Sequence, residues 1–227
     1  MAAPQWVIEL HSHTHYSHDS LTRLEDLHAI VQTHNIDKLA ITDHNVVDAA
    51  LELARLYPIW VIPGVEVMTT ERELLGWYIK GEVPVGRSPE ETIAALREQG
   101  ALIGVAHPFD RYRRGAWKPE VLARIVDQVD VIEVFNARCL RDEDNAKALA
   151  FAREHNKLMA AGSDAHTRRE YGRGLMNLPP FSNNAEGLRR ALQSATFEGQ
   201  RSSWDVHISS TYAKWVKRFV PSLRPKR

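Results

Sequence analysis

The chain has 227 residues, 44% of them hydrophobic and 26% charged, a composition that fits a globular protein of one domain or at most two small ones. Its 29 basic and 29 acidic residues balance, so no global field draws it to nucleic acid or to an anionic membrane. With one cysteine (Cys139), no signal peptide and no apolar run long enough to span a bilayer, the sequence predicts a cytoplasmic protein without an intrachain disulfide.

Short apolar runs alternate with amphipathic stretches along the chain. Strands are expected at 6–10, 38–41, 59–67, 74–79, 101–106, 129–135 and 158–161, with Pro63-Gly64 breaking the third. Helices are expected at 21–31, 46–56, 119–126, 142–155 and 186–194, and another from a capping box at Ser88 to Gly100. This alternation predicts βα units and a parallel sheet, and about seven units fit the length. We therefore expect a small β/α barrel, with a doubly wound open sheet as the alternative.

The end of the chain differs in composition from the rest. From position 214 onward it holds six basic residues and no acidic one. Tyr212, Trp215 and Phe219 recur at helical spacing, which predicts a helix packed on the barrel with its basic residues in solvent. We interpret 204–227 as a basic C-terminal extension of a single domain spanning 1–227. A nucleic-acid or membrane-surface contact is the alternative.

Residues capable of metal and acid–base chemistry come directly after the expected strands. These residues are His11, His13, Asp43, His44, Glu66, His107, Asn136, Arg138, Asp164 and His166. In a parallel barrel such positions meet on one face, where barrel enzymes carry their active sites. Histidines expected on solvated surfaces instead are His28, His34, His155 and His207. The convergence predicts a metal-dependent hydrolase.

Spacing strengthens the metal interpretation. His11 and His13 are two residues apart on extended backbone, so both imidazoles point to one side, and Asp164 and His166 repeat that spacing. Imidazole and carboxylate are both ligands of divalent ions. A lone histidine is more often a cap or a core residue, but five histidines at strand ends favour a shared metal site.

These motifs, taken together and in order, resemble the polymerase and histidinol phosphatase (PHP) domain phosphoesterases. The matching segments span about residues 7 to 170: His11-Ser12-His13-Thr14 with Ser17 and Asp19, Ile41-Thr42-Asp43-His44, Gly64-Val65-Glu66, Ala106-His107-Pro108 and Gly162-Ser163-Asp164-Ala165-His166. The resemblance implies a distorted, seven-stranded, TIM-like (β/α)7 barrel. It also implies two to three divalent metal ions (Mn, Zn or Fe) and hydrolysis of phosphate esters.

The resemblance also implies roles for single residues. A first metal would be held by His11, His13 and Asp164, bridged through Glu66 to a second at His107, with Asp19, His44 and His166 around a third. Glu73 stands where many members have a histidine, and we expect it to be a ligand that favours harder ions such as Mn. The alternative is an exposed strand residue beside a weak second site. Asp19 is preferred over its neighbour His18 because it matches the family pattern.

The mechanism expected of such a site is attack on phosphorus by a hydroxide bridging two metals, with Glu66 and Asp164 central to catalysis. An acidified metal-bound water or a non-ligating histidine such as His15 would protonate the leaving group. Arg138, with Asn136 beside it and Arg111 in a basic loop, would bind phosphate oxygens; the alternative for each arginine is a solvated surface position. The expected partner is a small phosphorylated substrate or a nucleic-acid end.

Two other functions compete with a phosphoesterase. An amidohydrolase-like enzyme acting on C–N bonds also uses a histidine pair after its first strand and a late aspartate, but it needs a longer, eight-stranded chain. A non-catalytic metal-binding barrel module is the second alternative. An intact set of ligands argues against it, because unpaired buried carboxylates and imidazoles are costly without a metal.

Overall fold

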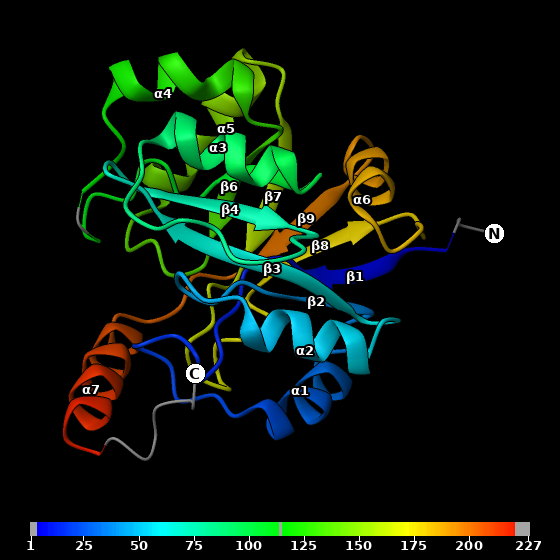
Figure 1. Cartoon of the computed structure of the whole chain (residues 1–227), viewed down its shortest axis with the longest axis vertical. Helices are drawn as coiled ribbons and strands as arrows, with labels where there is room; N and C mark the ends of the chain where they lie inside the picture. The colour runs from blue at the N-terminus through cyan, green and yellow to red at the C-terminus, as the bar shows by residue number, and fades with distance from the viewer. Residues whose placement is uncertain (1–3, 114, 221–227) are drawn as a thin grey trace.

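A mixed sheet runs through the computed structural model of the chain, which describes residues 4–113 and 115–220 (Figure 1). Its strands are β1 (Trp6–Glu9), β2 (Lys38–Ile41), β3 (Val61–Met68), β4 (Glu73–Trp77), β5 (Leu102–Val105), β6 (Val131–Asn136), β7 (Leu158–Gly162), β8 (Gly174–Leu178) and β9 (Thr196–Gly199). The helices are α1 (Leu27–Thr33), α2 (Asp48–Leu56), α3 (Pro89–Glu98), α4 (Pro119–Ile125), α5 (Asp142–Glu154), α6 (Ala185–Leu192) and α7 (Asp205–Phe219). Most of these elements lie where the hydrophobic pattern predicts them.

The sheet order is β7-β6-β5-β4-β3-β2-β1-β8-β9. Strands β1, β2 and β3 are parallel to one another, and so are β5, β6 and β7. Between these groups, β4 is antiparallel to both β3 and β5. The two reversals cancel, so six strands point the same way. Their C-terminal ends, which the chemical motifs follow, therefore share one face.

The expectation of seven parallel strands is wrong. The described residues form nine strands, and β4, β8 and β9 run antiparallel to their neighbours. A short turn joins β3 to β4, and a connection of that length can only form an antiparallel hairpin. Strands β8 and β9 were missed because β8 is only half buried and β9 is largely exposed, so neither forms a continuous apolar run.

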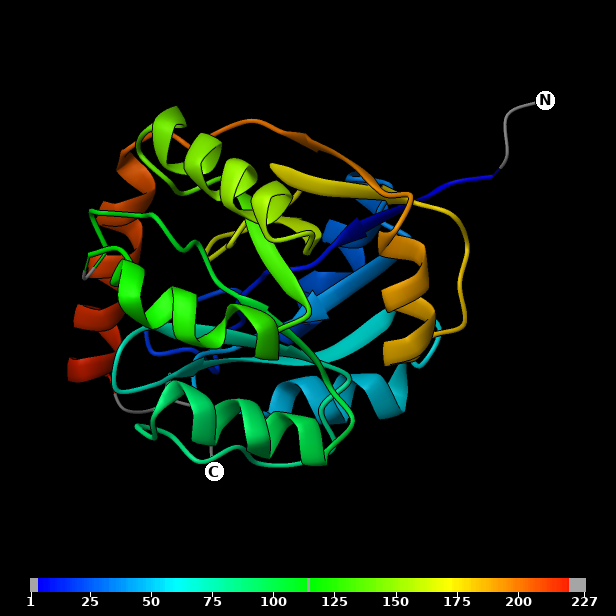
Figure 2. The same cartoon turned by 90° about the horizontal axis from the view of Figure 1, so that it is seen from above.

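The sheet curls into a barrel that is nearly closed at the level of the motifs (Figure 2). Beyond β1 and β7, Ser12 and Ala165 form a parallel bridge. His13 N donates to Ala165 O at 2.9 Å, and Asp164 N donates to His11 O at 2.8 Å. The first and last motifs of the sequence are thus joined directly by backbone hydrogen bonds.

Apolar side chains fill both the inside and the outside of this barrel. Helices α3, α4 and α5 cover one side of it and α1 and α2 another (Figure 1). Inside, the fully buried indole of Trp77 donates from Nε1 to the carbonyl of Leu10 at 2.9 Å. This bond ties β4 to the residue that precedes His11.

Two local predictions have different outcomes. The capping box of α3 is confirmed: Ser88 Oγ accepts from Glu91 N at 3.2 Å, and Ser88 N donates to the Glu91 carboxylate at 2.9 Å. The predicted break at Pro63-Gly64 is wrong, because β3 continues through it. A Cβ on Gly64 would lie 2.9 Å from Thr42 Cγ2, so this glycine marks a close approach of strands.

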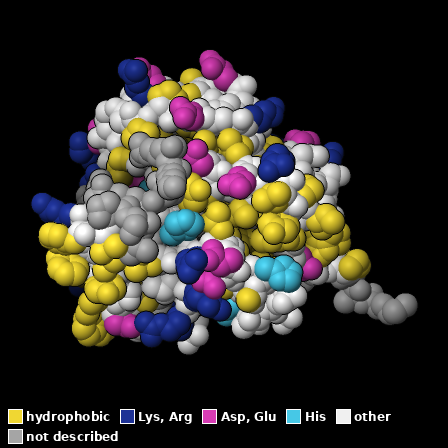
Figure 3. Space-filling view, turned by 60° about the horizontal axis from the view of Figure 1, so that its bottom comes forward, with side chains coloured by type: hydrophobic (Ala, Val, Ile, Leu, Met, Phe, Trp, Pro, Cys, Tyr) yellow, Lys and Arg dark blue, Asp and Glu magenta, His cyan; other side chains and the backbone are white. Residues whose placement is uncertain are grey.

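Helix α7 forms where the C-terminal periodicity predicts it, but its aromatic residues do not pack on the barrel. Tyr212, Trp215 and Phe219 are 59%, 60% and 61% exposed. A band of hydrophobic side chains lies along the left edge of Figure 3, where α7 is found. The face turned toward the barrel carries two small apolar and two polar residues, all buried: Val206, Ser210, Ala213 and Lys217.

Polar contacts attach α7 to the rest of the molecule. Lys217, expected in solvent, is buried, and its Nζ donates to the carbonyls of His15 and Ser17. The Arg138 guanidinium donates to Val206 O at 2.8 Å and to Ser210 Oγ at 2.7 Å. The remainder of the expected extension, 221–227, lies outside the described residues. Within the described ranges, no helix combines the length and hydrophobicity that crossing a bilayer would need.

Candidate metal centre

Four buried side chains form a first cluster at the C-terminal face of the barrel. His11 and His13 follow β1, Glu66 lies in β3 and Asp164 follows β7, and their ligand atoms all lie within 4.8 Å of one another. His13 Nε2 is 3.1 Å from Asp164 Oδ1, and His11 Nε2 is 3.3 Å from Glu66 Oε2. The structure therefore brings together four of the residues expected around the first metal.

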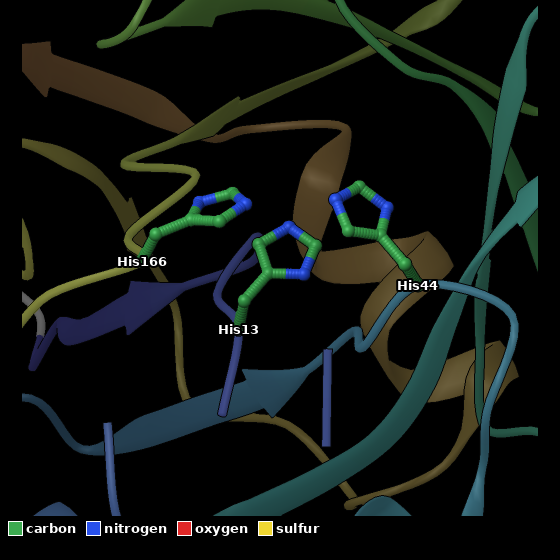
Figure 4. Close-up of side chains that lie close together, drawn as sticks. All are labelled: His13, His44 and His166. Carbon is green, nitrogen blue, oxygen red and sulfur yellow. The ribbon is translucent and has the colours of Figure 1, made fainter. Parts of the chain in front are cut away.

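A second cluster shares His13 with the first. Its other members are His44, which follows β2, and His166, which follows β7, and the three imidazoles face one another (Figure 4). Asp19 lies beside them, with Oδ1 3.5 Å from His44 Nε2 and 3.3 Å from His166 Nε2. Its neighbour His18 keeps half of its side chain exposed. Of the two, Asp19 holds the buried position next to the imidazoles.

The residues expected at a further metal lie on the other side of Glu66. His107 follows β5, and its Nε2 is 3.0 Å from Glu66 Oε1. Glu73, at the start of β4, is 8% exposed and lines the same cavity as His107. Burial and Arg113 oppose a charge on His107, but Glu66 and Glu73 outweigh them and raise its pKa. Glu73 thus shares a cavity wall with His107 and favours the charged form of its imidazole.

The centre contains buried polar atoms that no hydrogen bond within the described residues satisfies. They are His11 Nε2, His13 Nε2, Asp19 Oδ1, Glu66 Oε2 and Asp164 Oδ1. Leaving a buried polar atom unpaired costs about 1–3 kcal/mol, so gathering five in one place is unfavourable unless something binds them. Nitrogen and carboxylate oxygen donors at this spacing fit divalent cations.

Charges within the centre are strongly coupled. Burial alone would lower the pKa of His11, but the carboxylates, led by Glu133 and Asp164, outweigh it and raise that pKa well above its ordinary value. Burial is likewise outweighed at Asp164, where Arg113 and His11 hold the carboxyl pKa well below its usual range. The pKa of His44 rises to about 9, since Asp19 and Glu66 overcome its burial. Cations would take the place of the protons on these imidazoles.

Residues behind the ligands fix which ring nitrogen faces the centre. Glu133 in β6 accepts from His11 Nδ1 at 2.8 Å. Ser17 Oγ lies 3.0 Å from His13 Nδ1 and donates to Asp43 Oδ1 at 2.6 Å, so it accepts from the imidazole. Both rings are thereby held with Nε2 directed to the cluster, an arrangement that orients histidine ligands in metalloproteins.

The backbone at two of these residues adopts an uncommon conformation. His107 and Asp164 have φ angles of 26° and 52°, in the left-handed region that non-glycine residues seldom occupy. Gly162, at the end of β7, passes so near the centre that a Cβ there would clash with His11 and come within 2.9 Å of Glu133 Oε1. Two residues of the centre thus hold an uncommon backbone conformation, and such conformations are frequent at functional sites.

A cavity of about 270 Å³ opens above the clusters. His18, Asp19, His44, Glu73, His107 and His166 form one part of its wall. Arg113, Arg138 and Lys214 bring cationic groups to the same wall, and His207 and Thr211 from α7 also line it. The cavity thus joins the nitrogen and oxygen ligands to a set of positive charges.

Three residues expected to act on the substrate lie elsewhere. His15 is absent from the described lining of the cavity, and its ring packs against Tyr16 with centroids 4.9 Å apart. Arg111 is also absent from that lining and pairs with the buried Asp144 at 3.0 Å. Asn136 is fully buried beneath the site, where its Nδ2 donates to Glu133 at 3.1 Å and to Asp164 at 3.2 Å.

Arg138 is buried at the cavity wall rather than free to clamp a phosphate. Besides its bonds to α7, its Nε lies 3.2 Å from Glu170 Oε1. Arg113 instead reaches the centre from the basic loop, bonding Asp164 and, at 3.1 Å, Asn136 Oδ1. Sequence reasoning identified that loop but missed which arginine turns inward. Glu133, Lys214 and His207 were also missed, and no spacing in the sequence distinguishes them from ordinary strand and helix residues.

Comparisons with known proteins indicate the family of this chain. A family model described as PHP-associated matches residues 142–197. The chain is 39% identical over 168 residues to the uncharacterized protein MJ0417 of Methanocaldococcus jannaschii, covering 73% of this chain and 67% of that protein.

Two solved structures have a similar fold. One is a two-domain protein from Bacteroides vulgatus containing a PHP-like metal-dependent phosphoesterase, with a TM-score of 0.68, 17% identity and coverage of 94% of this chain and 73% of that one. The other is a lesion-specific endonuclease from Pyrococcus furiosus, with a TM-score of 0.61, 16% identity and coverage of 86% and 57%. With the motifs, the barrel and these matches in agreement, the chain belongs to the PHP family.

Proposed function

We propose that the protein is a metal-dependent phosphoesterase that hydrolyses a small phosphorylated substrate or a nucleic-acid end. One observation carries the proposal: a cluster of unsatisfied buried nitrogen and carboxylate atoms includes Asp19 at the wall of a cavity whose lining also holds Arg113 and Lys214. The first set suits cations, and the second suits an anion that would lie against them. A phosphate ester is a substrate that uses both.

The residues divide into three ligand sets around Glu66. His11, His13 and Asp164 would hold one ion with Glu66, while His107 and Glu73 would hold a second on the other side of that carboxylate. Asp19, His44 and His166 would hold a third. Divalent ions bound there supply Lewis acidity, which neutralises phosphate oxygens and lowers the pKa of the water that attacks phosphorus.

The chain's own residues position the reactants. Glu133 and Ser17 keep Nε2 of His11 and His13 directed at the cluster. Arg113, already hydrogen-bonded to Asp164, places a guanidinium where charge develops on a phosphoryl group. His15 lies outside the cavity lining and gets no role in this scheme. The similarity to a PHP-like metal-dependent phosphoesterase and to an endonuclease supports phosphate esters as the substrate class.

The experiment is a panel of phosphomonoesters, nucleotides and oligonucleotides assayed with Mn²⁺, Zn²⁺ or Fe²⁺, using the wild type and the His13→Ala and Asp164→Asn variants. We expect both variants to lose more than about 100-fold in kcat/KM, because even groups behind metal ligands are worth 10- to 100-fold. His28→Ala and Asp127→Asn, at exposed positions, are the matched controls.

Circular dichroism would show that the variants fold. Full activity of a folded His13→Ala or Asp164→Asn protein would contradict the site. Release of ammonia from nucleobases, without phosphoester turnover, would favour an amidohydrolase-like enzyme.

A further inference from the structure

We propose that helix α7 forms one wall of the substrate site and that Lys214 binds an anionic group of the substrate there, with His207 and Thr211 beside it. The inference rests on the proposed function and narrows it. Helix α7 lies outside residues 142–197, the segment matched as PHP-associated, and we infer that it helps to determine substrate binding. The ligand class is a phosphate group carried by a compact substrate.

Polar bonds hold α7 at a defined place over the centre. Lys217 donates to the carbonyls of His15 and Ser17, in the loop that also carries Asp19. Arg138, whose Nη1 lies 2.6 Å from His166 Nδ1, reaches Val206 O and Ser210 Oγ from the barrel side. The helix is therefore anchored to the same segments that carry the ligands, so its inward side has a fixed position relative to them.

One side of α7 is directed to the cavity. His207, Thr211 and Lys214 are spaced four and three residues apart, which places them on one side of a helix, and all three line the cavity. The Nε2 atom of His207 is buried without a hydrogen-bond partner among the described residues. The aromatic residues of α7 are exposed to solvent. The side of α7 that carries His207, Thr211 and Lys214 therefore faces the cavity and is not part of the hydrophobic core.

Lys214 stands between solvent and the centre. Its Nζ lies 3.4 Å from Asp19 Oδ2, and its side chain is 49% exposed. Asp19 would share its charge with a bound cation, which leaves the ammonium available to an anion in the cavity. An ammonium is a compact point charge with three donors, well suited to phosphate oxygens.

The other groups of the wall define the charge and size of the ligand. Arg138 and Arg113 lie along the same cavity. Burial is the largest cause that lowers the pKa of His207, and the charges of these two arginines lower it further, so this side of the cavity is cationic. The volume of about 270 Å³ lies near the lower end of the range usual for small-molecule sites, which fits a phosphate group on a compact substrate.

The test uses the metal-loaded full chain and compares Lys214→Gln and Lys214→Arg with the wild type. For the phosphomonoester turned over best, we expect Lys214→Gln to raise KM by about 10- to 100-fold, the worth of one charge-assisted hydrogen bond, with kcat changed much less. The concentration of inorganic phosphate that gives half inhibition should rise in parallel. Lys214→Arg, which keeps the charge, should recover most of the binding. Lys147→Gln, on the exposed side of α5, is the control.

Metal content, measured by inductively coupled plasma mass spectrometry, shows whether Lys214→Gln weakens substrate binding directly or acts through Asp19 on the bound metal. Unchanged metal content with weakened phosphate binding supports the inference. Unchanged KM and phosphate inhibition overturn it, and so does a loss of metal that accounts for the lost activity. Direct binding of inorganic phosphate to the metal-loaded protein distinguishes the two proposals. If no phosphoester is hydrolysed yet phosphate binding depends on Lys214, the proposed function fails and this inference stands.

Discussion

A histidine can offer a cation only one ring nitrogen at a time, and the residue behind the ring decides which one. At His11 that residue is Glu133, which also accepts from the backbone N–H of His107 at 2.7 Å. The buried carboxylate of Glu133 thus orients the imidazole of His11 in the first cluster and also holds the backbone of His107. We regard Glu133 as a positioning residue, since it acts through His11 and His107.

Replacing Glu133 with Gln keeps the size of the side chain but removes its charge. We expect metal affinity to fall by about 10- to 100-fold, as is common when the partner of a ligating histidine is changed. Titration of the metal-free protein against a chromophoric chelator would measure this, with Glu143→Gln on the exposed side of α5 as control. Equal affinities for the Glu133→Gln protein and the wild type would contradict the positioning role.

The histidines of the centre were predictable because their positions follow apolar runs, and the direction of a parallel strand determines which face its end reaches. Glu133 and Arg113 were not. Glu133 lies within an apolar strand, where its inward orientation depends on barrel curvature. Arg111 and Arg113 share one loop, and only the path of that loop decides that Arg113 meets Asp164.

Among the elements, α7 is attached in an unusual way. Its large aromatic side chains face solvent, while a lysine, the groups that bind Arg138 and the small side chain of Ala213 face the barrel. Hydrogen bonds to charged groups are worth about 1.5–3 kcal/mol each, so a few of them contribute substantially to holding the helix in place. A sequence pattern reports which residues share a side of a helix, but it does not report which side meets the protein.

This attachment predicts that replacing a buried lysine disturbs α7 more than replacing a large aromatic residue does. Lys217→Ala should release α7, because it removes the ammonium bound to two carbonyls, whereas Trp215→Ala should change stability by less than about 1 kcal/mol because its ring is largely exposed. Hydrogen exchange of the α7 amides, followed by mass spectrometry, would report the release. Faster exchange in the Trp215→Ala protein than in Lys217→Ala would refute the polar attachment.

At the scale of the whole molecule, the centre exists only when distant parts of the chain meet. Its ligands extend from His11 to His166, and the bridge between Ser12 and Ala165 joins the two ends of that span. The order of the βα units could be predicted from the sequence, but the reversal at β4 and the late strands β8 and β9 could not. These depend on turn length and on partial burial, which hydrophobic periodicity does not encode.

Because the unfolded chain lacks this arrangement, metal should stabilise the fold. A ligand at about 1,000 times its Kd adds about 4 kcal/mol, which for a chain of this size raises Tm by about 8–16 °C. Differential scanning calorimetry with and without Mn²⁺ or Zn²⁺ would measure the shift, which excess chelator should reverse. The Asp164→Asn variant should show a smaller shift. An unchanged Tm at saturating metal would mean that the site does not bind these ions.

The indole of Trp77 has a consequence for the precision of the centre. It spans the barrel interior from β4, and its Nε1–H holds the carbonyl of Leu10, one residue before His11. An indole is flat and rigid, so it sets the separation between the middle of the sheet and the end of β1. The spacing between His11 and Glu66 therefore depends on the width of one aromatic ring, which lies outside the lining of the cavity.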